Sequence, residues 1–551
     1  MSPCTTRWSR PSSASTSSCA RTAPSSAPPN SATPGHPNST SWRGWPVSSW
    51  STGTPTGATP GSRRAAPVTS RSTACPRRAE VGTGIPFAPW NFMLDVDGVN
   101  YSLPEQAAYA RRHPGTEILN LSSGINALRP PDVLVDTVVT CARDPLFWHD
   151  YDGPEGHLVG RAAVAAYETV RGGGTVALGP AHVLVTAGAS AALALAARGL
   201  HELARDRAAR PVALLPVPTF PLAGAALADA GFTVEEVAGD APGSRVPTVA
   251  ELIAAAPPET SVVYVNTFNN PTGERYEEAA LRTLVRWARD HEVRVLHDTV
   301  SSDVSASGEL PFLPAVAAAE GYAAGLITVS SLSKVRAVPG FRIGWLVADP
   351  SIVEELARLN ELGAPSSPGI AAPALLLDRM TTLAVEAAEG RCPADAPRRA
   401  QELLAALLEP YRTVTPGLED VTAAVAGALG SEETVEQLRS WRAELRATLA
   451  ENVALLAEGV GGELTDAPAW RGDFNTFVGI PALAGRNHLD VCHRLFREFG
   501  LQTLPAPAFG RDEPWWARRG TYRTRLSFAL PTPRWVAGLR RLDRAVKELS
   551  R

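Results

Sequence analysis

The chain of 551 residues contains only two lysines, Lys334 and Lys547, among 52 basic residues. Lys547 lies in a polar C-terminal segment, where it needs no special role. Lys334 follows the apolar run Leu326–Val329 and precedes a Pro-Gly turn, a pattern that predicts a buried strand running into a loop. An amine, unlike a guanidinium, can lose its proton and attack a carbonyl carbon to form a Schiff base. Lys334 is therefore the candidate catalytic residue.

Two neighbours of Lys334 suggest what it would work with. Ser331 offers a hydroxyl and Arg342 a fixed positive charge, and both groups suit an anion such as phosphate. The simpler alternative is a surface lysine in a loop. The scarcity of lysine in this chain and the flanking groups favour the chemical interpretation.

The residues around Lys334 resemble a known pattern. Ser331-Leu332-Ser333-Lys334, followed by Pro339-Gly340-Phe341-Arg342-Ile343-Gly344-Trp345, resembles the cofactor-lysine segment of fold-type I pyridoxal-phosphate enzymes, the class I/II aminotransferase family. The resemblance extends from about Leu119 to the C-terminus. It implies that Lys334 holds pyridoxal 5'-phosphate as an internal aldimine, that Ser331 and Arg342 bind its phosphate, and that an amino group moves between an α-amino acid and a 2-oxo acid.

A second phosphate-binding pattern lies earlier in the chain. Val183–Thr186 reads as a buried strand, and a turn of small residues then opens a helix: Gly188, Ala189 and Ser190. Backbone N–H groups and the positive end of the helix dipole attract phosphate at such a turn. The turn has neither a Walker lysine nor a GxGxxG spacing. The resemblance implies that it binds the cofactor phosphate.

Three residues near other strand ends match contacts to the cofactor ring. Asp298 ends the strand predicted from Val293, and a carboxylate there keeps the pyridine nitrogen protonated; the alternative is a capping residue for the next segment. Asn270 begins an Asn-Pro-Thr-Gly turn, and the resemblance implies that it donates to the ring oxygen. Phe220 matches the aromatic residue that stacks on the ring, unless it is a core phenylalanine.

Ser301 departs from the family pattern. Most aminotransferases carry a tyrosine three residues after the aspartate, and its hydroxyl binds the same ring oxygen as Asn270. Losing that donor should change the pKa of the aldimine, so a pyridoxal-phosphate lyase, cyclase or other specialised amino-acid enzyme remains an alternative. A non-catalytic regulator of the same fold is disfavoured, because the N-terminal segment shows no helical period and no recognition helix.

The resemblance also implies substrate and partner contacts. Arg525 matches the arginine that pairs with the substrate carboxylate, and Arg523 on the same strand face is the alternative. Gly124 matches a glycine loop against that carboxylate, although a simple turn glycine reads equally well. Tyr151 matches a tyrosine that reaches the cofactor phosphate of the partner subunit, which implies a homodimer with shared active sites. The candidates to line the pocket for the substrate side chain are Trp148, His149 and Asn475.

Strands alternate with helices between Val183 and Ala348, which predicts an α/β fold with a doubly wound, mostly parallel sheet. Ligands of such sheets bind at the carboxyl ends of the strands. We expect an inserted helical hairpin between about Met380 and Ser431, which either covers the active site or extends a dimer interface. The expected units are a disordered extension or mis-assigned start (1–84), an N-terminal arm with part of a small domain (85–150), a large pyridoxal-phosphate domain (151–352), an interdomain helix with the insertion (353–459) and a C-terminal small domain (460–551).

Composition limits the classes of function. Residues 1–79 are rich in Ser, Pro and Arg and hold nine basic residues and no acidic one, so the remaining chain is more acidic than the net charge of −4 suggests. An acidic body argues against nucleic acid or an anionic membrane surface as partner. Six scattered cysteines without a CxxC pair indicate reduced thiols in a cytoplasmic protein. We assign no metal ligands.

Overall fold

The structure of the chain is a computed structural model. The predicted extension at 1–84 and the candidates Trp148 and His149 lie outside the residues that it describes. The described residues are 103–147, 151–205, 209–239, 246–305, 310–363, 369–415, 417–429, 431–459, 464 and 470–551.

A seven-stranded sheet with the order β2-β8-β7-β6-β5-β3-β4 forms the centre of the fold. Only β8 runs antiparallel to its neighbours, and the remaining pairs are parallel. Apolar runs make these strands, because a parallel sheet is covered on both faces. The predicted mostly parallel α/β sheet is confirmed. The strands are β2 (Val183–Thr186), β3 (Val212–Val217), β4 (Thr233–Ala238), β5 (Thr260–Asn266), β6 (Arg294–Asp298), β7 (Leu326–Ser331) and β8 (Gly344–Val347).

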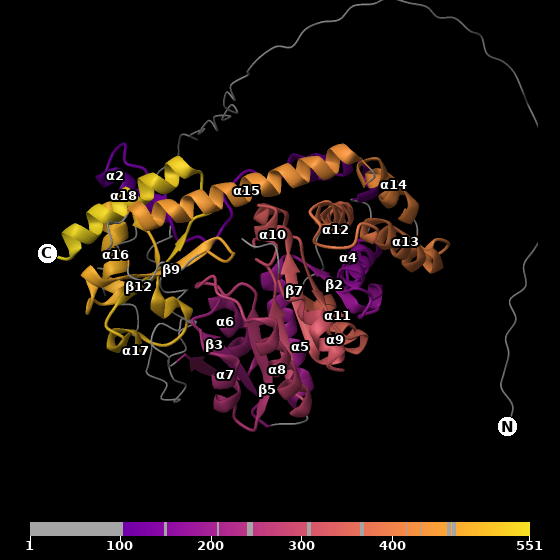
Figure 1. Ribbon diagram of the computed structural model, residues 1–551, viewed down its shortest axis with the longest axis horizontal. Helices are drawn as coiled ribbons and strands as arrows, with labels where there is room; N and C mark the ends of the chain where they lie inside the picture. Colours follow the sequence, from indigo (N-terminus) through magenta and orange to yellow (C-terminus); the bar gives the residue numbers. More distant parts are fainter. Residues whose placement is uncertain are drawn as a thin grey trace, which may run out of the picture. The chain divides into compact units, whose positions relative to one another are not determined.

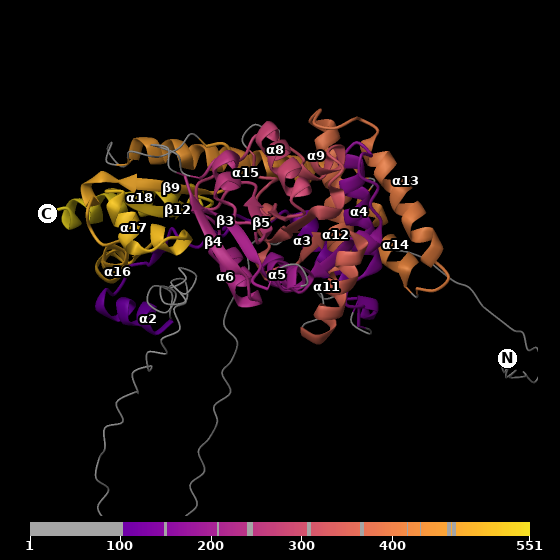
Figure 2. The ribbon, with the colours of Figure 1, turned by 90° about the horizontal axis from the view of Figure 1, so that it is seen from below.

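Helices cover both faces of this sheet, as Figure 2 shows with α5, α6 and α11 on one side and α8 and α9 on the other. Two apolar clusters explain the arrangement, because alternate residues of the strands pack against each helix layer. The first layer comprises α5 (Ala189–Arg205), α6 (Pro221–Ala230) and α11 (Pro350–Gly363). The second layer comprises α7 (Val249–Ala255), α8 (Glu278–Asp290) and α9 (Leu313–Ala319). Near β2 and β8 this layer continues with α3 (Asp132–Cys141), α4 (Leu158–Arg171) and α12 (Ala371–Ala388).

The C-terminal part forms a smaller α/β unit around the buried Trp535. Its antiparallel sheet has the order β11-β12-β9, and β1 pairs with β10 in parallel. Its strands are β1 (Leu119–Asn120), β9 (Asn475–Ile480), β10 (Leu501–Gln502), β11 (Leu504–Pro505) and β12 (Tyr522–Ser527). Its helices are α2 (Leu103–Arg112), α16 (His488–Phe499), α17 (Glu513–Arg518) and α18 (Thr532–Leu549).

The long helix α15 (Glu432–Gly459) connects the two regions, and in Figure 1 it runs from α18 to α12. Two helices precede it, α13 (Ala396–Leu408) and α14 (Leu418–Leu429), and they pack against α4 and α12. The inserted helical hairpin, expected from about Met380, therefore begins only after α12, which continues to Ala388. No helix in the described ranges is both long and apolar enough to cross a membrane.

Two short strands of the C-terminal unit have local explanations for their bounds. β1 is only two residues long, because the side chain of Asn120 accepts a hydrogen bond from the N–H of Ser122 (2.9 Å) and turns the chain. β12 begins at Tyr522, since its pairing with β9 starts at Ile480.

Candidate active site

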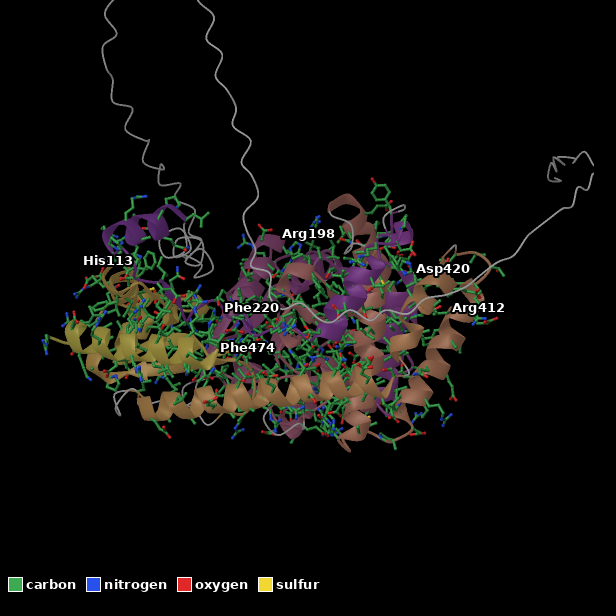
Figure 3. All side chains as sticks on the ribbon, turned by 90° about the horizontal axis from the view of Figure 1, so that it is seen from above. His113, Arg198, Phe220, Arg412, Asp420 and Phe474 are labelled. Atoms are coloured by element: carbon green, nitrogen blue, oxygen red, sulfur yellow. The ribbon has the colours of Figure 1, made fainter. Side chains whose placement is uncertain are left out.

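A cavity of about 370 Å³ lies at the carboxyl ends of β5, β6 and β7, with the C-terminal unit forming its other wall. Its walls include Phe220 and Phe474, both of which are labelled in Figure 3. The carboxyl end of a doubly wound sheet is the expected place for a ligand. The structure brings together at this cavity most of the residues proposed from the sequence: Gly124, Ala189, Ser190, Phe220, Asn270, Asp298, Ser301, Ser331, Lys334, Arg342 and Arg525.

Lys334 lies in the short helix α10 (Leu332–Val335) directly after β7. Its Nζ donates a hydrogen bond to the carbonyl oxygen of Gly124 (2.5 Å). Burial, with Arg525 and Arg342, lowers the pKa of Lys334 to about 8, and the negative charge of Asp473 acts in the opposite direction. The amine therefore loses its proton more readily than an exposed lysine, as a nucleophile or a base requires.

Asp298 ends β6 with its carboxylate held by two donors. Oδ2 accepts from the hydroxyl of Tyr264 (3.0 Å), and Oδ1 accepts from the N–H of Val300 (3.0 Å). Burial raises the pKa of Asp298 to about 6, although both hydrogen bonds lower it. The carboxylate is thus a buried anion at neutral pH, and a protonated ring nitrogen would stabilise it.

Tyr264 is a site residue that the sequence argument missed. It is fully buried on β5, and its hydroxyl orients Asp298. A signal existed: Tyr264 and Asn266 share one face of β5, and Asn266 pairs in register with Asp298 on β6.

Arg342 and the start of α5 form a cationic corner of the cavity. The guanidinium donates to the carbonyl oxygens of Ala187 (3.0 Å) and Pro339 (3.0 Å). Gly188 has a φ of 93°, and a Cβ there would lie 2.6 Å from Nη2 of Arg342. Gly188 is not part of the cavity wall, but glycine at this position lets Arg342 approach the helix start. Ser190 and Ser331 add hydroxyls to the same wall.

Arg525, on β12, lies buried beside Gly124 and Asn270. It donates to Oδ1 of Asn270 (2.9 Å) and to the carbonyl oxygen of Ser122. The first bond sets the amide of Asn270, so that its Nδ2 is left to donate to another group. A Cβ on Gly124 would lie 3.1 Å from Nη2 of Arg525, so glycine keeps this approach open. Arg523, the alternative arginine, does not line the cavity.

Two predicted residues behave differently from the rest. Ser301 lines the cavity and lies beside Asp473, a buried acid that the sequence argument missed. Tyr151 is 94% exposed and is not part of the cavity wall. Its proposed contact belongs to a partner subunit, so this role stays a prediction. Asn475, the remaining side-chain pocket candidate, lines the cavity.

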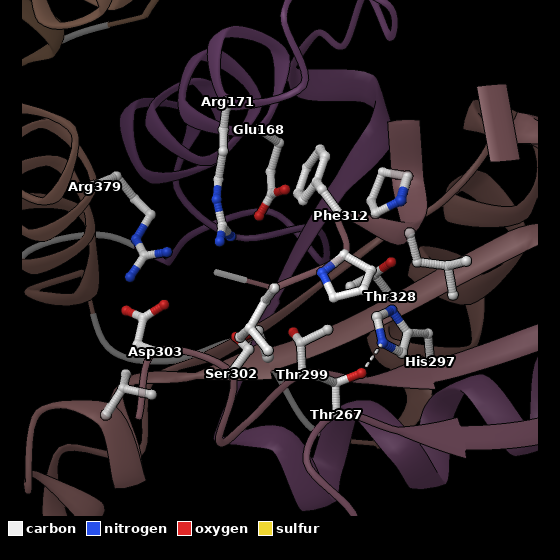
Figure 4. A pocket seen from close by; sticks show the side chains of 16 residues that line it. Glu168, Arg171, Thr267, His297, Thr299, Ser302, Asp303, Phe312, Thr328 and Arg379 are labelled. Carbon is white, nitrogen blue, oxygen red and sulfur yellow. Dashed lines mark hydrogen bonds between the residues drawn. The ribbon is translucent and has the colours of Figure 1, made fainter. Parts of the chain in front are cut away.

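A second cavity of about 30 Å³ lies behind the lysine segment and is shown in Figure 4. It contains buried charges, with Asp303 facing Arg379 and with Arg171 and Glu168 above them. The neighbouring Arg336, two residues after Lys334, pairs with Asp378 (2.5 Å) and Asp303 (3.1 Å). This volume suits one or two water molecules and no larger ligand. The buried ion pairs therefore anchor the segment that carries Lys334.

The sequence is similar to known proteins. The model of the family "Aminotransferase class I and II" matches residues 116–391, half of the chain. An aspartate aminotransferase of Streptomyces avermitilis is 27% identical over 261 residues, covering 46% of this chain and 60% of the relative. An LL-diaminopimelate aminotransferase of Syntrophobacter fumaroxidans is 28% identical over 252 residues, covering 45% of this chain and 61% of that relative. The chain thus spans less than two thirds of the length of these curated relatives.

Solved structures resemble the fold over a longer range. An aromatic aminotransferase from Pyrococcus horikoshii aligns with a TM-score of 0.59 and 19% identity, over 80% of this chain and 98% of the other. An aspartate aminotransferase from Rhizobium meliloti aligns with a TM-score of 0.59 and 18% identity, over 82% of this chain and 96% of the other. At these sequence identities the similarities show a shared fold and nothing more.

Proposed function

We propose that this chain, which belongs to the class I and II aminotransferase family, binds pyridoxal 5'-phosphate at Lys334 and moves an amino group between an α-amino acid and a 2-oxo acid. One observation carries the proposal. A single cavity combines an amine of lowered pKa, a buried carboxylate, a cationic corner at a helix start and a buried arginine.

The residues fit pyridoxal phosphate group by group. The phosphate suits Arg342, Ser190, Ser331 and the first N–H groups of α5. The protonated ring nitrogen suits Asp298. Its buried carboxylate accepts two hydrogen bonds and forms no ion pair with any cation of the described residues. Phe220 offers its ring to the pyridine face, and Asn270 has its Nδ2 available for the ring oxygen. Each polar group of the cofactor thus has a complementary partner.

The chain's own side chains then perform the reaction steps. When bound, the cofactor supplies an electron sink for the bond that breaks at the substrate Cα. Arg525 binds the substrate carboxylate through two N–H groups and so orients the Cα–H bond. Nζ of Lys334, whose lowered pKa of about 8 brings its neutral form within reach near neutral pH, accepts the Cα proton and delivers it again. Asp298 keeps its negative charge beside the ring nitrogen throughout.

A homodimer is part of the proposal. The exposure of Tyr151, in a loop that opens α4, supports a role for its hydroxyl in the cofactor phosphate site of a second copy. The substrate would then bind in a cavity to which both copies contribute.

The test is a half-reaction followed by absorbance. Purified full-length protein loaded with pyridoxal phosphate is mixed with single amino acids from a panel, without oxo acid. We expect at least one amino acid to abolish the visible absorbance band and release its oxo acid in equal amount, and added 2-oxo acid to restore the band. Release of ammonia with the band retained would instead indicate elimination, the alternative that Ser301 leaves open.

A further inference from the structure

The cavity wall around Arg525 is apolar. Leu504 on β11 pairs in register with Arg525 on β12, and Ile125 follows Gly124, which packs against the guanidinium. Both residues line the cavity, and so does Leu222, the second residue of α6. A ligand carboxylate held by Arg525 would therefore have aliphatic side chains beside it.

Two of these aliphatic side chains are open to solvent. Ile125 is 38% exposed and Leu222 is 39% exposed. Among the leucine and isoleucine side chains that the structure describes, only Leu103 and Leu203 are exposed as well. Apolar surface at the wall of a cavity favours a ligand that removes it from water. Ile125 and Leu222 are thus placed to contact an apolar part of a ligand.

The charged side chains of the cavity wall are few. Among the described lining residues they are Asp298, Lys334, Arg342 and Arg525. With the cofactor bound as proposed, the first three face the cofactor, and Arg525 faces the substrate carboxylate. No described lining residue is then left to neutralise a second carboxylate or an ammonium group of the substrate. A charged side chain would lose hydration here without gaining a partner, and this loss lowers affinity.

The polar candidate for this part of the wall, Asn475, already has partners within the protein. Its Nδ2 donates to Oδ2 of Asp473 (3.0 Å), and its Oδ1 accepts from Oγ of Ser527 (2.7 Å). The preceding residue, Phe474, adds an aromatic surface to the cavity wall. This stretch of the wall therefore offers an apolar surface next to a side-chain amide that is held in place.

We propose that the amino donor carries an uncharged, apolar side chain, aliphatic or aromatic, and that Ile125 and Leu222 contact this side chain. The inference rests on the proposed function and names the class of amino acid on which that function acts. Its premises are the register that places Leu504 beside Arg525, the exposure of Ile125 and Leu222, and the charges of the cavity wall.

A binding experiment tests the inference without turnover. Full-length protein loaded with pyridoxal phosphate is titrated by calorimetry with 4-methylpentanoate and with succinate, which keep the carbon skeletons of leucine and aspartate but lack the amine. Loading matters, because the cofactor phosphate occupies Arg342, which would otherwise attract the second carboxylate of succinate. We expect Kd for 4-methylpentanoate to be about tenfold lower or more. Equal or tighter binding of succinate would overturn the inference.

Variants then identify the contacts. Rates of the half-reaction with leucine and with alanine are compared in Ile125→Ala and Leu222→Ala. Each substitution should lower the ratio of the leucine rate to the alanine rate about threefold to tenfold, because alanine has only a methyl group to contact. Leu203→Ala is the matched control, since Leu203 is 40% exposed on α5 and lies outside the cavity wall.

The control should keep the wild-type ratio. Wild-type ratios in both Ile125→Ala and Leu222→Ala would remove these residues as contacts and so contradict the inference. Amino transfer from aspartate, glutamate or lysine as fast as from leucine, methionine or phenylalanine would refute the substrate class and leave the proposed function standing. A protein that holds no pyridoxal phosphate at Lys334 would refute the proposed function, and the inference with it.

Discussion

Asp298 bears a large electrostatic cost in the cofactor-free protein. Its pKa of about 6 lies above the ordinary value of 3.8, mainly because the carboxylate is buried. A difference of this size corresponds to about 3 kcal/mol at neutral pH, where the group is ionised in both the folded and the unfolded chain. The site therefore holds its negative charge at the expense of stability, and a bound cationic ring would recover that cost.

Asp298→Asn should consequently stabilise the cofactor-free protein. A raised carboxyl pKa means that folding favours the protonated acid, so wild-type stability decreases as pH rises from about 4 to about 6. We expect the variant to have a higher free energy of unfolding by about 1–3 kcal/mol above pH 6, and no advantage below about pH 4. Urea unfolding at both pH values measures this. A variant that is less stable at both would contradict the buried-charge explanation.

Arg525 should control substrate affinity through geometry as well as charge. Arg525→Lys keeps the positive charge but loses the paired N–H groups, so we expect KM for the amino acid to rise about tenfold to a hundredfold. Arg523→Lys, two residues earlier on the same strand, is the matched control and should change KM little. Steady-state kinetics on both variants decides which arginine binds the carboxylate. Equal effects would refute the assignment.

At the scale of elements, the turn between β2 and α5 depends on Gly188, whose positive φ and missing side chain leave room for Arg342. Gly188→Ala would place a methyl group against Arg342 in addition to straining a φ of 93°. Gly174→Ala is the matched control, because its φ of 77° is also positive but nothing lies within 4 Å of an added Cβ. We expect similar losses of stability and a fall in pyridoxal-phosphate affinity of about tenfold or more for Gly188→Ala only. Fluorescence titration with the cofactor measures the affinity of both variants, and equal affinities would contradict the role of this turn.

At the scale of the whole molecule, the proposed shared active sites require two copies of the chain. We expect a dimer by light scattering, and we expect Tyr151→Phe to lower pyridoxal-phosphate affinity about fivefold or more without changing the molar mass. Tyr411→Phe is the control, since that tyrosine is also exposed, at 39%, and lies in the 3₁₀ helix after α13. A wild-type protein that binds the cofactor while it is monomeric would refute shared active sites.

The sequence predicted the large sheet and most of the cavity wall, because a few buried strands with polar residues at their ends determine both. It did not predict Tyr264 or Asp473. The first was hidden in an apolar strand whose two faces have to be separated by pairing with β6. The second contacts Ser301 across a long sequence separation, and such tertiary contacts leave no local pattern. The helices α13 and α14 were expected, but their packing against α4 and α12, away from the described cavity wall, required the structure.

The most direct test of the central claim uses the two lysines. Wild-type protein incubated with pyridoxal phosphate is reduced with borohydride, which fixes the cofactor to any lysine that holds it covalently, and peptides are then mapped by mass spectrometry. We predict modification of the Lys334 peptide at one cofactor per chain, an unmodified Lys547 peptide, and no fixed cofactor in Lys334→Ala. Modification of Lys547 instead, or a Lys334→Ala variant that retains activity, would contradict it.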